Sequence, residues 1–281
     1  MEQVSGRDAT IHLAALQRIA DDNGGNRAAP GPGYEASVDY VVRMLRQYGY
    51  QVSTPRYPVY RHRGPMLRDV VAQTSTGSQD HVVMLGAHLD SVENGPGIND
   101  NGTGVAALLE IAAKLGPSPS MRNAVRFAFW GSEEDDMQGS THYVETLSDQ
   151  QRADIQVYLN LDMLGSPNVG YFVLTNDDAA TQGAIVDQQL AAEGVRAENI
   201  DYDDGSDFVP FVDAGIPSVG IQAGDEQTKT RDEAATWGGT AGQVFDRCYH
   251  SACDRLSNVD AVAFDRYTNA VAGTVEYLAT H

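Results

Sequence analysis

The sequence of 281 residues is poor in cysteine, in lysine and in long apolar segments. It contains two cysteines and two lysines, and it lacks an apolar run of the about 18 residues that a membrane-spanning helix needs. The first residues, MEQVSGRDATIHL, also lack the basic segment and the apolar run of a signal peptide. We therefore expect neither a transmembrane helix nor a signal peptide in this chain.

Positive charge is scarce as well. The chain has 19 basic and 39 acidic residues, which gives a formal net charge of −20. A surface of this kind repels the phosphates of nucleic acids and anionic lipids. We therefore expect neither a nucleic acid nor a membrane as a partner.

The two cysteines, Cys248 and Cys253, stand five residues apart in the segment RCYHSACD. A zinc site built on sulfur normally uses more cysteines. The pair either forms a small disulfide loop, which suits an oxidising compartment, or remains as two buried thiols of a cytosolic protein. We favour the disulfide because its loop would hold Tyr249 and His250 in place.

The hydrophobic pattern predicts an α/β protein. Apolar residues repeat with helical spacing at about 8–21 and 34–48, and short β-rich runs then alternate with further helical patterns. The predicted strands lie at 81–87, 124–130, 155–161, 171–175 and 217–222, and the predicted helices between and after them lie at 102–115, 139–147, 178–193, 206–214 and 259–278. This alternation predicts one three-layer domain, with a mixed, mostly parallel sheet covered by helices on both faces.

Polar side chains follow three of the predicted strands directly. His88 and Asp90 follow the first, Glu133 and Glu134 the second, and Asp162 the third. Ligands of open α/β sheets bind beyond the carboxyl ends of the strands, so we expect these side chains to share one rim. Taken singly, each has a plainer explanation as a surface residue, a solvated loop or a turn.

Two further segments carry the same chemistry. A glycine-rich loop at 97–102 contains Asp100, which alone could cap the next helix, and Tyr249-His250 stands late in the chain. Carboxylates gathered at one rim would repel one another unless cations neutralise them. Imidazole and carboxylate ligands without thiolate suit zinc in a hydrolytic site, although manganese or cobalt would also fit.

Several segments together resemble the M28 zinc aminopeptidases, in particular the small secreted single-domain members from bacteria. The matching segments are NGGNRA (23–28), GYEASVDYV (33–41), GAHLDSV (86–92), GINDNGTG (97–104), RFAFWGSEE (126–134), LNLDMLGSPNVGYFV (159–173) and WGGTAGQVFDRCYHSACDRLSN (237–258). They span almost the whole chain, in order and with matching spacing. The resemblance implies the zinc exopeptidase fold over residues 1–281, peptide substrates with free N-termini, secretion and a monomer.

The resemblance also implies two zinc ions that share a bridging aspartate and a bridging water. The bridge matches Asp100. One ion would take His88 and Asp162, and the other would take Glu134 and His250. In the same family the peptide bond after the bridging aspartate is cis, which here is the bond between Asp100 and Asn101.

The remaining roles are carried over in the same way. Glu133 matches the general base that acts on zinc-bound hydroxide, and Tyr249 matches the tyrosine that stabilises the oxyanion. The free α-amine of the substrate would lie among Glu133, Asp162 and a zinc ion. Asp90 is expected to support the imidazole of His88.

The chain departs from the family pattern around the substrate. Relatives have Arg-Ser-Asp-His where this chain has the run from Gly205 to Phe208, apolar residues in place of Asp135-Asp136, and an aromatic residue in place of Gln222. We expect Asp162, Ser206 and Gln222 to contact the substrate. The family preference for large apolar N-terminal residues is the prediction, and a shift toward polar or basic residues is the alternative.

Close relatives also bind a structural calcium ion through acidic residues near both termini. Asp260 and Asp265 match the C-terminal side, whereas Asp8 stands in a different context. A calcium site is therefore a further expectation.

Three other functions compete with the aminopeptidase. A glutaminyl cyclase of the same fold would use one zinc ion, and a carboxypeptidase would want a cationic group where this chain has Gly205. A binding module that has lost its metals should show broken ligands, whereas the full ligand set is present here.

Overall fold

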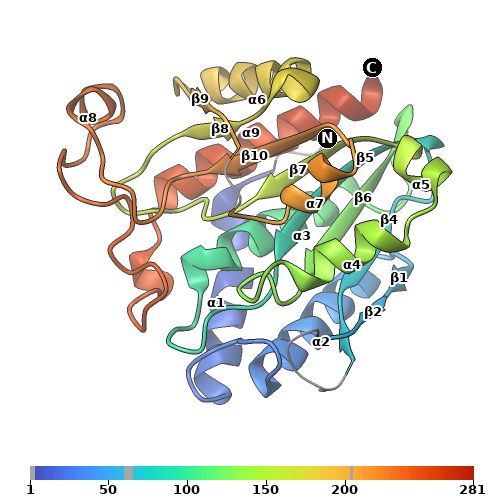
Figure 1. The fold of residues 1–281 in the computed structure, drawn as a ribbon, viewed down its shortest axis with the longest axis horizontal. Helices are drawn as coiled ribbons and strands as arrows, with labels where there is room; N and C mark the ends of the chain where they lie inside the picture. Colours follow the sequence, from blue (N-terminus) through green and yellow to red (C-terminus); the bar gives the residue numbers. More distant parts are fainter. Residues whose placement is uncertain (1–3, 60–65, 203–204) are drawn as a thin grey trace.

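The computed structural model describes residues 4–59, 66–202 and 205–281, which fold around one central sheet (Figure 1). The helices are α1 (Gly6–Asp22), α2 (Pro32–Gln47), α3 (Thr103–Leu115), α4 (Gln138–Thr146), α5 (Asp149–Asp154), α6 (Ala180–Ala192), α7 (Val209–Asp213), α8 (Arg231–Trp237) and α9 (Ala261–Thr280). The strands are β1 (Val52–Ser53), β2 (Arg56–Tyr57), β3 (Leu67–Arg68), β4 (Val70–Gln73), β5 (Ser78–His88), β6 (Asn123–Trp130), β7 (Ile155–Leu161), β8 (Phe172–Leu174), β9 (Glu198–Ile200) and β10 (Ser218–Gln222).

The main sheet has the strand order β1-β4-β6-β5-β7-β10-β8-β9. The four central strands, β6, β5, β7 and β10, run parallel, whereas β4 and β8 join their central neighbours in antiparallel fashion. A separate two-stranded sheet pairs β2 with β3. The prediction of a mixed, mostly parallel sheet is confirmed.

Alternation along β5 divides the protein interior into two cores. Val83 and Leu85 face a core that also contains buried residues of α1, α2, α3, α6 and α9. Val82 and Met84 face the opposite core, which contains Val144 of α4 and Phe211 of α7. Successive side chains of a strand point to opposite faces, so a strand buried on both sides is apolar at every position. The sheet therefore lies between two helical layers, as predicted.

The two cores differ in composition. α3 is buried along nearly its whole length beneath α1 and α2, which explains its almost continuous apolar sequence. The second core is built around aromatic rings, with Tyr158 stacked on Phe211 at a centroid distance of 3.8 Å and Trp130 packed at 6.0 Å from the same ring. Burial of these large rings supplies much of the hydrophobic stabilisation on that face.

The predicted elements of the layers are all present, with ends shifted by a few residues. The largest difference concerns the helix predicted at 206–214, because α7 begins only at Val209 and leaves Ser206 and Asp207 in the preceding bend. None of the described helices is long and apolar enough to cross a membrane.

Candidate active site

Three parallel strands deliver side chains to one rim of the sheet. His88 is the last residue of β5, Glu133 and Glu134 follow β6, and Asp162 follows β7. Because these strands are adjacent and parallel, their carboxyl ends meet at the same edge. The expectation that these residues share a rim therefore agrees with the topology.

Asp100 lies between two histidines that come from distant parts of the chain. Its Oδ1 is 3.1 Å from His88 Nε2, and its Oδ2 is 3.3 Å from His250 Nε2. Asp162 Oδ1 lies 3.5 Å from His88 Nε2, and Glu134 Oε2 lies 2.9 Å from His250 Nε2. The five predicted metal ligands are thus brought together, with Asp100 in the middle.

Two sets of donor atoms in this cluster are close enough to hold an ion. In each set the ligand atoms lie within 4.8 Å of one another, and the sets are His88 with Glu133 and Asp162, and His88 with Asp100 and Glu134. Glu133, the predicted general base, therefore lies as close to His88 and Asp162 as a metal ligand would. The peptide bond between Asp100 and Asn101 is cis, as the resemblance implied.

Buried oxygen atoms of the cluster have no hydrogen-bond partner in the described part of the chain. They include Glu134 Oε1 and Asp162 Oδ1. The Nδ1 atom of His88 likewise has no hydrogen-bond partner among the described residues. Burying an unpaired carboxylate oxygen is costly, so such atoms normally bind a metal or a hydrogen-bond donor. The residues present therefore fit cations held by imidazole and carboxylate, the donor set that zinc takes in catalytic sites.

The ionisation of the cluster is strongly perturbed. Burial and then the charge of Asp100 raise the pKa of Glu134 to about 7, and burial raises the pKa of Glu133 well above its ordinary value despite His88. The pKa of Asp100 is lowered, because hydrogen bonds from His250 and His88 outweigh its burial. The site thus carries an excess of negative charge that protons or cations must balance.

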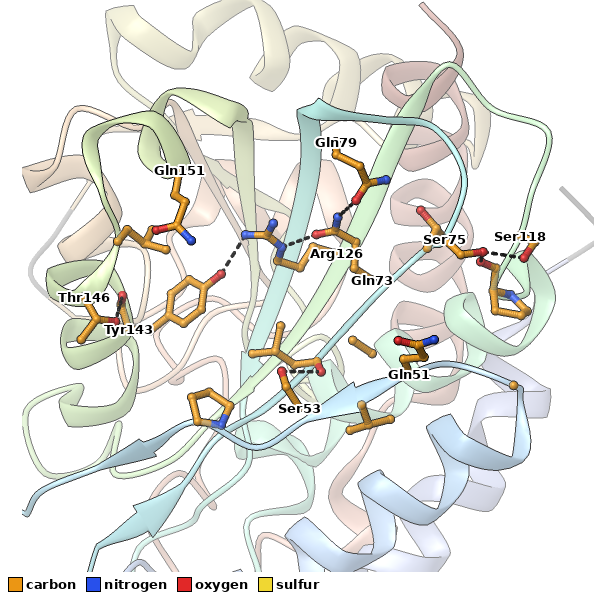
Figure 2. A pocket seen from close by; sticks show the side chains of 18 residues that line it. Gln51, Ser53, Gln73, Ser75, Gln79, Ser118, Arg126, Tyr143, Thr146 and Gln151 are labelled. Carbon is orange, nitrogen blue, oxygen red and sulfur yellow. Dashed lines mark hydrogen bonds between the residues drawn. The ribbon is translucent and has the colours of Figure 1, made fainter.

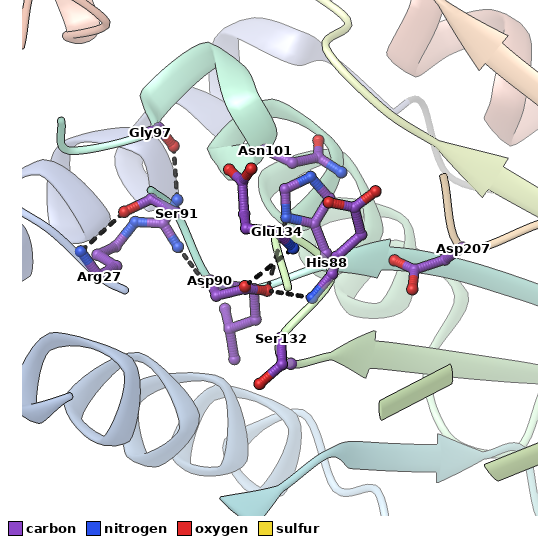
Figure 3. A network of polar contacts seen from close by, with 12 residues as sticks. Arg27, His88, Asp90, Ser91, Gly97, Asn101, Ser132, Glu134 and Asp207 are labelled. Atoms are coloured by element: carbon purple, nitrogen blue, oxygen red, sulfur yellow. Dashed lines mark hydrogen bonds and ion pairs between the residues drawn. The ribbon is translucent and has the colours of Figure 1, made fainter. Parts of the chain in front are cut away.

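Asp90 lies behind the cluster and joins two of its segments (Figure 3). Its carboxylate accepts the backbone N–H groups of Glu133 at 3.2 Å and Glu134 at 3.4 Å, and it lies 3.7 Å from His88 Nδ1. That last distance is longer than a hydrogen bond. Asp90 therefore contacts the imidazole electrostatically and positions the glutamate loop directly.

Arg27 braces the loop between His88 and Asp100. It is fully buried, and its guanidinium donates to the backbone carbonyls of Leu89, Pro96 and Gly97 (Figure 3). Its backbone N–H also donates to Ser91 Oγ at 2.9 Å. The planar fork of arginine suits several carbonyls at once, and its positive charge interacts with the carboxylates of Asp90, Asp254 and Asp100.

The turn that carries Tyr249 and His250 is closed by a disulfide. The sulfur atoms of Cys248 and Cys253 are bonded at 2.04 Å, so the disulfide prediction is confirmed. The next residue, Asp254, accepts the backbone N–H groups of Asn99 at 2.8 Å and Asp100 at 3.0 Å. The turn and the Asp100 loop are therefore bound to each other.

Several residues at the site have unfavourable backbone angles. Ser132, Met163 and His250 have φ values of 54°, 50° and 52°. Left-handed conformations of residues other than glycine cost about 1–3 kcal/mol each and collect at functional sites. Here they stand immediately before Glu133, immediately after Asp162 and at a predicted ligand.

The predicted substrate contacts lie beside the cluster. The Ser206 hydroxyl donates to Asp162 Oδ2 at 2.7 Å and accepts from Asn160 at 2.8 Å, so it holds the Asp162 carboxylate. Gln222 ends β10 and is half-buried next to this segment, since Asp162 N donates to the carbonyl of Ile221. Asp135 accepts a hydrogen bond from Gln138 at 2.6 Å. Contacts of Ser206 and Gln222 with a substrate remain predictions.

Asp207 is a buried carboxylate to which sequence analysis assigned no role. Its Oδ1 accepts from Ser140 at 2.5 Å, while its Oδ2 has no hydrogen-bond partner among the described residues. Burial raises the pKa of Asp207 to about 7. Arg27 and Asp254 were missed in the same way, although Arg27 lies in the segment NGGNRA and Asp254 directly follows a cysteine.

The residues of the expected calcium site have partners of their own. Asp260 accepts the backbone N–H groups of Val262 and Ala263 and caps α9, and Asp265 accepts from Ser5 at 3.4 Å. Asp8 lies 3.7 Å from Lys114. The calcium site stays a prediction.

A groove of about 820 Å³ lies elsewhere, over β4, β6 and α4 (Figure 2). Half of its lining residues are glutamines, serines and threonines, and Arg126 bonds there with Gln73 and Tyr143. The residues around His88 do not belong to its described lining. The acidic rim is therefore the candidate site for hydrolytic chemistry.

Comparison with known proteins agrees with this geometry. The peptidase family M28 matches residues 69–275, a range that contains every predicted metal ligand. The chain belongs to peptidase family M28. The assignment from the quoted sequence segments is thus confirmed.

Individual relatives and solved structures extend the comparison. The leupeptin-inactivating enzyme 1 of Streptomyces exfoliatus is 44% identical over 265 residues, which cover 93% of this chain and 59% of that enzyme. A zinc aminopeptidase from Bacillus subtilis superposes with a TM-score of 0.66 at 25% identity, over 78% of this chain and 51% of that one. A glutaminyl cyclase from Porphyromonas gingivalis superposes with a TM-score of 0.77 at 21% identity, over 99% of both chains, and so shows the fold alone.

Proposed function

We propose that this M28 chain is a two-zinc aminopeptidase that removes single residues from peptides with a free N-terminal amine. The observation that carries the proposal is the position of Asp100, whose two oxygens lie 3.1 Å and 3.3 Å from His88 and His250. An aspartate shared in this way, with a further carboxylate beside each histidine, suits two ions rather than one. A one-zinc cyclase would not require the second half of this ligand set.

The chain offers a separate ligand pair for each ion. His88 and Asp162 would hold one, Glu134 and His250 the other, and Asp100 would bridge them. When bound, the ions supply Lewis acidity that polarises the scissile carbonyl and makes hydroxide available near neutral pH. The unpartnered oxygens of Glu134 and Asp162 support this assignment.

Glu133 is the proposed general base. Its neighbour Glu134 is a proposed ligand, and Asp90 holds the backbone N–H groups of both residues. Burial raises the pKa of Glu133, which brings a carboxylate toward the range in which it accepts and returns a proton efficiently. Glu133 would take a proton from the attacking water and donate one to the leaving amine.

Tyr249 is the proposed oxyanion donor. Its ring stacks on that of His250 at a centroid distance of 3.8 Å, which places it beside a ligand. Burial and then the carboxylates of Asp100 and Asp162 raise the pKa of its hydroxyl, so the group stays protonated and able to donate at neutral pH. A protonated donor aimed at developing negative charge stabilises the transition state.

The substrate amine would be recognised by carboxylate. Glu133 and Asp162 belong to one set of donor atoms around His88, and both remain partly exposed. A protonated or metal-bound amine would be favourable there, whereas an acetylated N-terminus would lose that interaction. We further propose a preference for large apolar N-terminal residues, with Gln222 and Ser206 near the side chain that is removed.

The setting of the enzyme belongs to the same proposal. A disulfide within the described residues suits an oxidising, extracytoplasmic compartment, so we propose that the protein is secreted. We also propose that it acts as a monomer on peptides and carries a structural calcium ion at Asp260 and Asp265. Metal analysis and solution mass measurement would test these points directly.

One assay set tests the central claim. Aminoacyl-p-nitroanilides of Leu, Met, Phe, Lys, Arg and Glu, with N-acetyl-Leu-p-nitroanilide as the blocked control, are incubated with the zinc-loaded protein, the chelated protein and the Glu133→Gln variant. We expect cleavage of the unblocked substrates only, fastest for large apolar residues. Chelation should abolish it, and Glu133→Gln should reduce kcat by about 10²–10⁴-fold with two zinc ions still bound.

Other outcomes would redirect the assignment. Cyclisation of a glutaminyl peptide with one bound zinc ion would indicate a cyclase. A protein that binds two zinc ions but cleaves none of the substrates would contradict the aminopeptidase proposal. Fastest cleavage of Lys or Arg substrates would leave the reaction intact and correct the apolar preference.

A further inference from the structure

The asparagine that precedes the bridging aspartate is completely buried. Asn99 has an exposed fraction of 0%, and it is the direct neighbour of Asp100. We propose that Asn99 is a positioning residue that joins three ligand-bearing segments into one unit. The inference rests on the proposed two-zinc function, because it concerns how strongly the chain holds those ions.

The first link joins Asn99 to the segment that follows Asp162 in the sequence. The Asn99 carbonyl oxygen, Oδ1, accepts the backbone N–H of Gly165 at 3.0 Å, and its Nδ2 donates to Ser166 Oγ at 3.1 Å. These partners stand three and four residues after Asp162. The side chain of Asn99 therefore fixes the distance between the Asp100 loop and the Asp162 loop.

The second link runs to the turn that carries Tyr249 and His250. The Nδ2 group of Asn99 also donates to Asp246 Oδ2 at 2.7 Å. Asp246 Oδ1 in turn accepts the backbone N–H of Cys248 at 2.8 Å, where the turn begins. Asn99 therefore connects the Asp100 loop to the His250 side of the site as well.

All the polar atoms of this side chain have partners. Both Nδ2 hydrogens and the Oδ1 atom of Asn99 are used, and each partner lies on a segment that bears a proposed ligand or directly follows one. A carboxamide is required here, because it donates and accepts from one planar group. Groups that orient metal ligands typically change metal affinity by about 10–100-fold when they are lost.

Asn101, the other asparagine beside Asp100, also links this loop to another segment. Asn101 Nδ2 donates to the carbonyl of Leu161 at 2.8 Å, and its Oδ1 accepts from Gly104 N at 3.0 Å. Its Oδ1 also accepts from Met163 N at 3.3 Å, so Asn101 joins the loop to the segments on both sides of Asp162. No bond of Asn101 to the turn of His250 is found within the described residues. Asn99 is therefore the residue to change in order to separate the two sides of the site.

A swap of donor and acceptor tests the proposal. Asn99→Asp removes the donor to both Asp246 and Ser166. The double variant Asn99→Asp with Asp246→Asn restores a donor and an acceptor between positions 99 and 246, with the charge unchanged. The matched control is Asn168→Asp, since Asn168 also binds backbone groups of another loop, at Thr240 and Val244, but neither it nor these partners lie within four residues of a proposed ligand. Each single substitution adds the same negative charge.

The measured quantity is the affinity for zinc alone, by competition with a chromophoric chelator, at a temperature at which circular dichroism shows every variant folded. We expect Asn99→Asp to lower the affinity for the weaker-bound ion by about 10–100-fold, although the added negative charge by itself attracts cations. The double variant should recover part of that loss, because the bond to Ser166 stays absent. Asn168→Asp should bind zinc within about 3-fold of the unchanged protein, even if the unfolding temperature of its metal-free form falls.

The outcomes separate the two proposals. If the unchanged protein does not bind two zinc ions, the two-zinc function is wrong and this inference falls with it. If the unchanged protein binds two ions and Asn99→Asp binds them as tightly, or if the loss equals that of Asn168→Asp or persists in full in the double variant, Asn99 is a structural residue only. If Asn99→Asp does not fold, the double variant and the control still decide, because the proposal requires the double variant to fold and to bind both ions.

Discussion

Two buried histidines of this protein have nearly the same exposure, but their pKa values are shifted in opposite directions. His12 in α1 is 2% exposed and His88 at the end of β5 is 1% exposed. His12 lies between two tyrosine hydroxyls, with Tyr40 at 2.6 Å and Tyr48 at 3.3 Å, and burial lowers its pKa to about 4. For His88 burial also acts to lower the pKa, but the carboxylates of Asp162, Glu133 and Asp100 prevail and raise it.

The difference shows what marks the candidate site. Burial alone makes a histidine a neutral member of the core, because the charged form loses its hydration. A buried histidine whose ring is surrounded by carboxylates instead belongs to a negatively charged region that attracts protons or cations. The neighbours of a histidine therefore indicate its role better than its burial does.

The largest effect expected is on metal binding. His88→Ala should lower zinc affinity by more than about 100-fold, because losing a direct ligand costs more than losing a supporting group. The proposed aminopeptidase activity should fall in parallel. His12→Gln should leave zinc binding unchanged, and chelator competition on both variants is the measurement. Equal losses in the two variants would contradict the contrast.

The reverse contrast is expected in the dependence of stability on pH. The pKa of His12 falls from 6.5 to about 4 on folding, so the unfolded chain binds more protons between those values. Stability is therefore fully present above pH 6.5 and is lost as the pH falls toward 4. Urea unfolding should show the unchanged protein losing about 2 kcal/mol more than His12→Gln between pH 7 and pH 4.5. Parallel curves would show that His12 does not titrate as described.

Asp90 permits a finer test of the acidic side. Asp90→Asn keeps the size of the side chain but removes the charge behind His88 and one acceptor for the Glu133 and Glu134 backbone. We expect zinc affinity to fall by about 10–100-fold, with less change in the unfolding temperature of the metal-free protein. Isothermal titration with zinc measures the first effect and calorimetry the second. A change in stability alone would mean that Asp90 only holds the loop.

The smallest effect on zinc binding is expected at the neutral histidine. Tyr40→Phe removes the hydroxyl 2.6 Å from His12 Nδ1 and leaves that buried nitrogen unpaired. Such a loss costs about 1–3 kcal/mol of unfolding free energy. Urea denaturation at pH 7 should show it, with zinc binding and turnover unaffected. A fall in zinc affinity would show that the surroundings of His12 and those of His88 are coupled, which would contradict the comparison.

The fold was predictable where apolar residues repeat, and two helices escaped because nothing in them is buried. Neither α5 nor α8 has a buried residue, although Trp237 at the end of α8 packs partly buried against both cores, so neither helix shows hydrophobic periodicity. Both nevertheless begin with a capping box, Ser148 with Gln151 and Thr230 with Glu233. The capping signal in the sequence would have found them. The two-residue strands β1, β2 and β3 are too short to show any alternation.

The proposed metal ligands were predictable from the sequence, whereas the residues that hold the ligand-bearing loops in place were not. The family resemblance supplied His88, Asp100 and the other proposed ligands, and the structure brings them together. Arg27 and Asn99 act through hydrogen bonds to loops that are far away in sequence, and no local pattern announces such partners. The expected contact of Ser206 with a substrate stays a prediction, and the hydrogen bond from its hydroxyl to Asp162 was not foreseen.

The sheet tapers from its centre to its margins, and this shape has a consequence for behaviour at high concentration. β5, in the middle, has 11 residues, whereas β1 and β9 at the two edges have 2 and 3. A short edge strand exposes few unpaired N–H and C=O groups, so it is a poor template for another chain. The same arrangement that carries long strands to the acidic rim therefore also discourages two molecules from joining their sheets and aggregating.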